Sequence, residues 1–119
     1  MFGFRTSKII LVGLFSTSLL ALPAKAENRV GGLDLSTYCA RNLGPNYRTF
    51  RWSQVYFENE KDAYTWRCVI YTNQIPNSDA ATAIVGFDTH AVCKAQYGET
   101  AYGRLADRRN VYSWSCYKP

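Results

Sequence analysis

The chain has 119 residues, four cysteines and a formal net charge of +5. Arg5, Lys8 and Lys25 supply three of these positive charges, so only +2 remains on the chain beyond position 26. So small a positive charge on the remaining chain argues against a nucleic-acid-binding protein. The length fits one small domain.

Residues 1–26 are predicted to be a cleaved signal peptide. Arg5 and Lys8 supply a basic start, Ile9 to Leu22 an apolar run, and Ala24-Lys25-Ala26 a cleavage site. A membrane anchor is the alternative, but the run is interrupted by polar residues and is shorter than the ~20 residues that a span requires. We therefore expect one secreted or periplasmic domain over residues 27–119, with no membrane segment after cleavage.

The mature chain contains two copies of one unit. Cys93 lies 54 positions after Cys39, and the closing Tyr-x-Trp-x-Cys signature that ends at Cys68 returns 48 positions later at Cys116. The first copy is therefore six residues longer in its middle. We expect repeat one over 32–71, a linker over 72–85 and repeat two over 86–117.

The four cysteines are expected to form two disulfides and not a metal site. Export leads to an oxidising compartment, and successive cysteines are much too far apart along the chain to match the short spacing of metal-ligand pairs. A unit that closes on itself pairs Cys39 with Cys68 and Cys93 with Cys116. The crossed pairing, Cys39 with Cys116 and Cys68 with Cys93, obeys the same symmetry and stays open.

Each copy is predicted to fold as a helix followed by two strands. Asp34 and Asp88 are placed to cap helices over 35–43 and 89–97. Gly44, in the left-handed conformation, is expected to end the first helix, and Gly98 to end the second. Strands are expected over 47–57, 63–71, 101–106 and 111–117. We predict one α+β domain of two pseudo-symmetric αββ repeats, stapled by disulfides, with the four strands in one sheet or two hairpins.

The closing signatures carry most of the aromatic pattern. Period-two spacing places Tyr64 and Trp66 on the same strand face as Cys68, and Tyr112 and Trp114 on that of Cys116. A face that brings its cysteine to a helix is a core face, so we expect these aromatics to pack inside. A sugar-stacking role for them is the less favoured interpretation.

The better candidates for ligand contact lie in the extended part of the first copy. Trp52, Gln54 and Tyr56 share one side of the strand expected over 47–57, opposite Val55 and Phe57. If the latter pair faces the core, two aromatic rings with an amide between them face outward. The alternative is that both sides of this strand are buried.

No catalytic, cofactor or metal site is predicted. All cysteines are better used in disulfides, the single histidine, His90, lies next to a helix cap, and no glycine-rich phosphate loop is present. The carboxylates of Glu58, Glu60 and Asp62 fall in one polar turn, a pattern typical of a solvated hairpin tip. We expect a protein that is not an enzyme.

The repeated helix-Cys and Y-x-W-x-C pattern resembles a group of secreted bacterial proteins and domain appendages that are frequent in filamentous and photosynthetic bacteria. Their unit often reads A-Y-x-W-x-C, matched here by Ala63-Tyr64-Thr65-Trp66-Arg67-Cys68, with Val111 in place of the alanine in the second copy. The resemblance covers Gly32 to Tyr117 and implies an extracellular accessory module, without implying any activity.

From these features we expect a secreted, non-catalytic binding module for cell-envelope or extracellular polysaccharide, or for peptidoglycan, with Trp52, Gln54 and Tyr56 as its contacts. The alternative is a protein-directed inhibitor or effector that acts through an exposed loop. The turn from Glu58 to Asp62, expected to be the longer one, would be its contact element.

Overall fold

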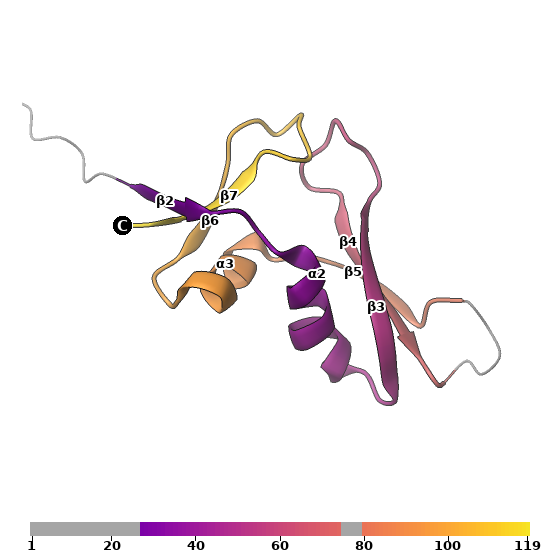
Figure 1. Cartoon of the computed structure of the whole chain (residues 1–119). Coiled ribbons are helices and arrows are strands. Elements are labelled where there is room, and N and C mark those ends of the chain that lie inside the picture. The colour runs from indigo at the N-terminus through magenta and orange to yellow at the C-terminus, as the bar shows by residue number, and fades with distance from the viewer. Residues whose placement is uncertain (1–26, 75–79) are drawn as a thin grey trace, which may run out of the picture.

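The computed structural model describes residues 27–74 and 80–119 (Figure 1). The expected signal peptide and part of the expected linker lie outside these residues. In chain order the elements are β2 (Asn28–Gly31), α2 (Leu35–Tyr38), β3 (Phe50–Phe57), β4 (Trp66–Thr72), β5 (Ala83–Gly86), α3 (Thr89–Tyr97), β6 (Tyr102–Leu105) and β7 (Trp114–Lys118). Helix α2 continues into a π-helical turn (Cys39–Leu43) and a 3₁₀ turn (Gly44–Asn46).

The described strands form two antiparallel three-stranded sheets, and each sheet carries one helix. The strand orders are β3-β4-β5 and β2-β7-β6. The predicted α+β domain with two αββ repeats is confirmed, and the question of one sheet or two is answered in favour of two.

A short strand precedes each helix and joins the sheet of the other repeat. Strand β5 leads into α3 but pairs with β4, where Val85 lies opposite Cys68. Strand β2 leads into α2 but pairs with β7, where Gly31 lies opposite Cys116. The two repeats are therefore interlocked by an exchange of leading strands. Within the expected linker over 72–85, Thr72 is the last residue of β4 and Ala83 the first of β5.

Both helices begin at the predicted aspartates. The Asp34 carboxylate accepts hydrogen bonds from the Thr37 amide at 3.0 Å and from the Thr37 hydroxyl at 2.6 Å. The Asp88 carboxylate accepts from the amides of His90 and Ala91. Each cap thus satisfies amides that have no partner within the helix.

The two glycines after the helices play different parts. Gly98 ends α3 with a positive φ of 108°, as a glycine stop predicts. The prediction for Gly44 is wrong, because its backbone has the dihedral angles of a right-handed helix. Gly44 is buried against Phe50, and a Cβ there would lie 2.4 Å from the ring carbon Cζ. The fold therefore requires a residue without a side chain at position 44.

The disulfides join each helix to the closing strand of its own repeat. Cys39 bonds to Cys68 and Cys93 to Cys116, with Cα atoms 5.6 and 5.4 Å apart. All four cysteines are fully buried, and each pair stands at the centre of a hydrophobic cluster. The within-repeat pairing predicted from the duplication is confirmed.

The repeats meet at their hairpin turns, which we call turn one (59–65) and turn two (107–113); both lie at the same end of the molecule (Figure 1). The Ala63 amide donates to the Arg108 carbonyl at 2.9 Å, and the Val111 amide donates to the Glu60 carbonyl at 3.0 Å. These two bonds are related by the same 48-residue displacement as the closing signatures. A local twofold symmetry therefore relates the two sides of the junction.

Turn one is not the longer turn that the sequence suggested. Both turns have the same internal bonds, for example Thr65 to Asp62 and Ser113 to Asn110 between backbone amide and carbonyl. The extra length of the first repeat lies largely in strand β3, which has eight residues against four in β6.

Candidate functional site

Strand β3 presents the three predicted contact residues on one exposed side. The side chains of Trp52 and Tyr56 are 44% and 36% exposed, and Gln54 between them is also exposed. On the other side of the strand, Phe50 and Val55 pack against the cluster around the Cys39–Cys68 disulfide. The strand is thus buried on one side only, and the predicted trio lies on the open side.

A contact that the sequence did not predict fixes the first of these aromatics. Tyr71 lies opposite Trp52 on β4, and the two rings stack with centroids 4.0 Å apart and planes 7° from parallel. Stacking restrains the indole and covers one of its faces, which leaves the other face for a ligand. Because the partner lies on a different strand, only the strand register reveals this pair.

The remaining strands extend the same surface. In the sheet register, Val69 lies between Gln54 and Ile84, and Ile84 is exposed. We call the surface made by Trp52, Gln54, Tyr56, Tyr71 and Ile84 the outer face. It combines aromatic and aliphatic carbon with one amide that can both donate and accept hydrogen bonds.

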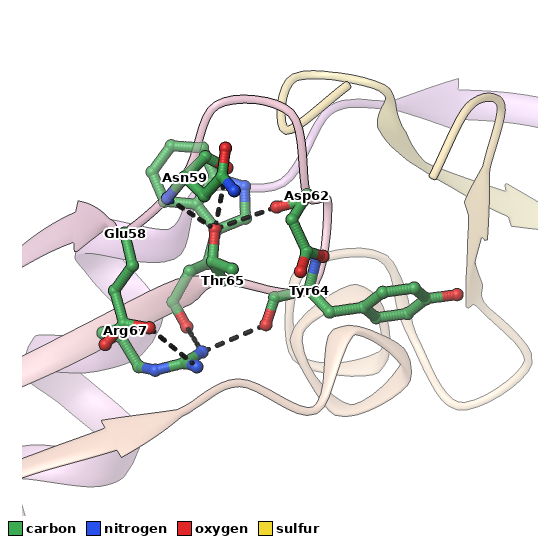
Figure 2. A network of polar contacts seen from close by, with 7 residues as sticks. Glu58, Asn59, Asp62, Tyr64, Thr65 and Arg67 are labelled. Atoms are coloured by element: carbon green, nitrogen blue, oxygen red, sulfur yellow. Dashed lines mark hydrogen bonds and ion pairs between the residues drawn. The ribbon is translucent and has the colours of Figure 1, made fainter. Parts of the chain in front are cut away.

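One border of the outer face is a salt bridge beside turn one. Arg67 lies opposite Tyr56 and pairs with Glu58, with Nη2 and Oε1 3.3 Å apart. The same guanidinium also donates to the carbonyl oxygen of Tyr64, as Figure 2 shows, and to that of Trp66. These bonds tie the end of the outer face to the backbone of the turn.

Turn one is held together by its own polar groups. The Thr65 hydroxyl shares its one proton between the carbonyls of Asn59 and Asp62 and accepts from the Asn59 amide, as Figure 2 shows. The Asp62 carboxylate accepts from the Tyr64 amide at 2.9 Å. Within the expected contact element, the Asn59 and Asp62 side chains are thus used to close the turn.

The tyrosines of the two closing signatures are not core residues. Tyr64 and Tyr112 lie in the turns before their strands begin, and they are 62% and 69% exposed. The tryptophans are half-buried, and their indole nitrogens donate across the junction: Trp66 to the Val111 carbonyl at 2.8 Å and Trp114 to the Ala63 carbonyl at 2.7 Å. The expected core face is therefore confirmed for the cysteines and wrong for the tyrosines.

The corresponding surface of the second sheet is engaged differently. Tyr102 and Tyr117 lie opposite each other with ring centroids 6.3 Å apart, and the Arg104 guanidinium lies 5.7 Å above the Tyr117 ring. Glu27 forms a salt bridge with Arg104 and accepts a hydrogen bond from the Tyr102 hydroxyl. The Glu27 and Arg104 side chains thus occupy the polar groups and one ring face here, in contrast to the outer face.

Two titratable groups beside the helix starts, His90 and Asp34, have structural partners. His90 Nδ1 accepts a hydrogen bond from the Gly103 amide at 3.0 Å. The hydrogen bonds from the Thr37 side chain and amide, together with the Arg41 charge, lower the pKa of Asp34 below its ordinary value. Among the described residues, no group of three or more His, Cys, Asp or Glu side chains is arranged to hold a metal ion.

None of the helices within residues 27–74 and 80–119 is long and apolar enough to span a bilayer. Comparisons with protein-family models, with curated proteins and with solved structures gave no match. Function is therefore inferred from the chemistry of this chain's own surfaces.

Proposed function

We propose that the protein is an exported, non-catalytic module that binds polysaccharide of the cell envelope or the extracellular space, peptidoglycan included, through its outer face. One observation carries the proposal: Trp52, Gln54 and Tyr56 form an exposed row along a rigid strand, and Tyr71 stacks behind the indole. Aromatic rings bind the hydrogen-bearing face of a sugar, and an amide binds its hydroxyls.

The spacing of the row favours a polymer over a single sugar. Trp52 and Tyr56 are four positions apart on β3, which corresponds to roughly 13 Å along an extended strand. A single sugar ring reaches one of these aromatics, whereas an extended chain contacts both and passes over Gln54. The rigid, sheet-borne row needs little ordering on binding, which lowers the entropic cost.

Export is supported by two features of different kind. The two disulfides fit an oxidising compartment. The signal peptide predicted over residues 1–26 would deliver the chain there, and the net charge of +2 that remains favours contact with anionic envelope polymers. A non-catalytic role agrees with the contacts of His90 and Asp34, whose side chains form hydrogen bonds within the fold.

The alternative, a protein-directed inhibitor or effector acting through turn one, has lost its main support. That hypothesis relied on a longer turn in the first repeat, whereas turn one and turn two have equal length and equivalent bonds. A feature that both repeats share is explained by the scaffold.

The test is a sedimentation assay of the mature protein with insoluble cell-envelope polysaccharide, peptidoglycan and protein-coated beads. We expect co-sedimentation with at least one polysaccharide, and about tenfold weaker binding by a folded Trp52→Ala, Tyr56→Ala variant. Co-sedimentation with the protein-coated beads but with no polysaccharide, or equal binding by the variant, would contradict the outer face as a polysaccharide-binding surface.

A further inference from the structure

Two cavities at the repeat junction share the indoles of Trp66 and Trp114 in their walls. We call them cavity one, with a volume of about 540 Å³, and cavity two, with a volume of about 280 Å³. Both lie apart from the outer face, since none of the residues that define that face lines either cavity.

The two cavities are symmetry mates. Besides the indoles, cavity two is lined by Ala63, Tyr64, Phe87, Asp88, Thr89 and His90. The counterparts of these residues under the duplication, Val111, Tyr112, Leu33, Asp34, Leu35 and Ser36, all line cavity one. The duplicated scaffold therefore builds this cavity twice, and the differences between the copies decide which one has room for a ligand.

The clearest difference is the residue two positions after the helix cap. In cavity two this residue is His90, whose imidazole is fixed by the hydrogen bond from the Gly103 amide to Nδ1. In cavity one it is Ser36, with only a hydroxymethyl group. Cavity one also extends to Arg29 and Val55, which have no counterpart in the wall of cavity two. Cavity one is thus the open member of the pair.

The walls of cavity one combine aromatic carbon with a few hydrogen-bonding groups. The indole N–H groups of Trp66 and Trp114 are already bonded to backbone carbonyls, so the rings offer carbon surface. Tyr112 lines the cavity and is largely exposed, which places it on the open side. The Asp34 oxygens each accept one bond from Thr37, and each can accept another.

We infer that cavity one binds a single hydroxylated sugar ring, with the hydrogen-bearing face of the ring against the aromatic wall of Trp66, Trp114 and Tyr112. The sugar hydroxyls bond to the Asp34 carboxylate and the Ser36 hydroxyl. A volume of this size is typical of small-molecule sites, which are mostly apolar with few placed polar groups. The site is separate from the outer face and takes one ring, where the outer face takes a chain.

The three tryptophans make the two sites distinguishable in one experiment. In ¹H–¹⁵N spectra of the mature protein, the indole signals of Trp66 and Trp114 report on the junction and that of Trp52 reports on the outer face. Glucose, N-acetylglucosamine and glucuronate are titrated separately to high millimolar concentration. We expect at least one of them to shift the Trp66 and Trp114 signals to saturation.

Two variants test the assignment of the site. Ser36→His copies the residue of the second repeat and should weaken binding at least about tenfold without unfolding the chain. Tyr112→Ala removes an exposed ring and should weaken it similarly. Ser36→Ala keeps the space but removes one hydroxyl contact, so it should weaken binding less than Ser36→His does.

Absence of a saturable junction shift with all three sugars would overturn the inference, as would parental affinity in both Ser36→His and Tyr112→Ala. A shift of the Trp52 signal alone would overturn it while supporting the proposed function. Saturable junction shifts without co-sedimentation on polysaccharide would support the cavity site and count against the outer face.

Discussion

The indole nitrogen of Trp66 donates a hydrogen bond of 2.8 Å to the carbonyl oxygen of Val111, so a side chain of the first repeat closes on the backbone of the second. The bond from Trp114 to Ala63 repeats this contact in the opposite direction. The tryptophans that the duplication preserves thus hold the two repeats together, and they form the shared wall of two cavities.

Replacing Trp66 with Phe should test this role. The ring is largely kept, but the buried Val111 carbonyl loses its donor, which typically costs about 1 to 3 kcal/mol. Chemical denaturation measures the free energy of unfolding. Trp52→Phe, an exposed site without such a bond, serves as the control and should stay within about 0.5 kcal/mol of the parent. Equal stability of both variants would contradict a structural role for the Trp66 indole N–H.

Gly44→Ala should destabilise the protein through overpacking. The new Cβ would lie 2.4 Å from Phe50 Cζ, so the ring or the helical turn must move, at a cost of about 1 to 3 kcal/mol. Gly32→Ala is the matched control, because a Cβ there meets nothing within 4 Å. Thermal unfolding should show a lower midpoint for the first variant only. A Gly44→Ala midpoint equal to that of Gly32→Ala would mean that Phe50 does not pack on this glycine.

The Asp34 cap should make stability depend on pH. Bonds from Thr37 and the Arg41 charge lower the pKa of Asp34 in the folded state. Its contribution is therefore fully present above the unfolded pKa of about 3.9 and is lost as the pH falls through the lowered folded pKa. Asp34→Ala should cost about 1 kcal/mol at neutral pH, and this difference should shrink below that window.

Asp34→Asn provides the control for this measurement. The amide keeps a cap but does not titrate, so the variant should lie close to the parent at neutral pH and lack this acid-dependent loss. Urea unfolding at a series of pH values gives both comparisons. A pH-independent difference between Asp34→Ala and the parent would contradict a role for the ionised carboxylate.

Local signals predicted the parts of the fold that depend on neighbouring residues. Asp34 and Asp88 marked the helix starts, and the duplication favoured the pairing of Cys39 with Cys68, although it left the crossed pairing open. The leading strands escaped prediction because each has only four residues and pairs with a strand of the other repeat. The close approach of Phe50 to Gly44 likewise depends on packing and not on a local preference.

The tyrosines of the closing signatures show how a correct period can be extended too far. The alternation holds from Trp66 to Cys68, but Tyr64 precedes the strand because the Thr65 hydroxyl closes a turn there. Ser113 does the same before Trp114. A hydroxyl residue at the same place in both copies was a visible signal for these turns. The Trp52, Gln54 and Tyr56 row was visible from alternation alone, whereas Tyr71 required the register.

The most direct test compares the two sheet faces in one chain. Binding isotherms on insoluble envelope polysaccharide are measured for the parent and for two double variants, with folding checked by circular dichroism. One double variant carries Trp52→Ala and Tyr56→Ala, and the other carries Tyr102→Ala and Tyr117→Ala. The first double variant removes the two exposed rings of the outer face. The second removes two rings of the other sheet, where Glu27 bonds to the Tyr102 hydroxyl and Arg104 lies over the Tyr117 ring. We predict about tenfold weaker binding for the first variant and parental binding for the second. Equal retention of all three folded proteins would contradict a polysaccharide-binding role for the outer face.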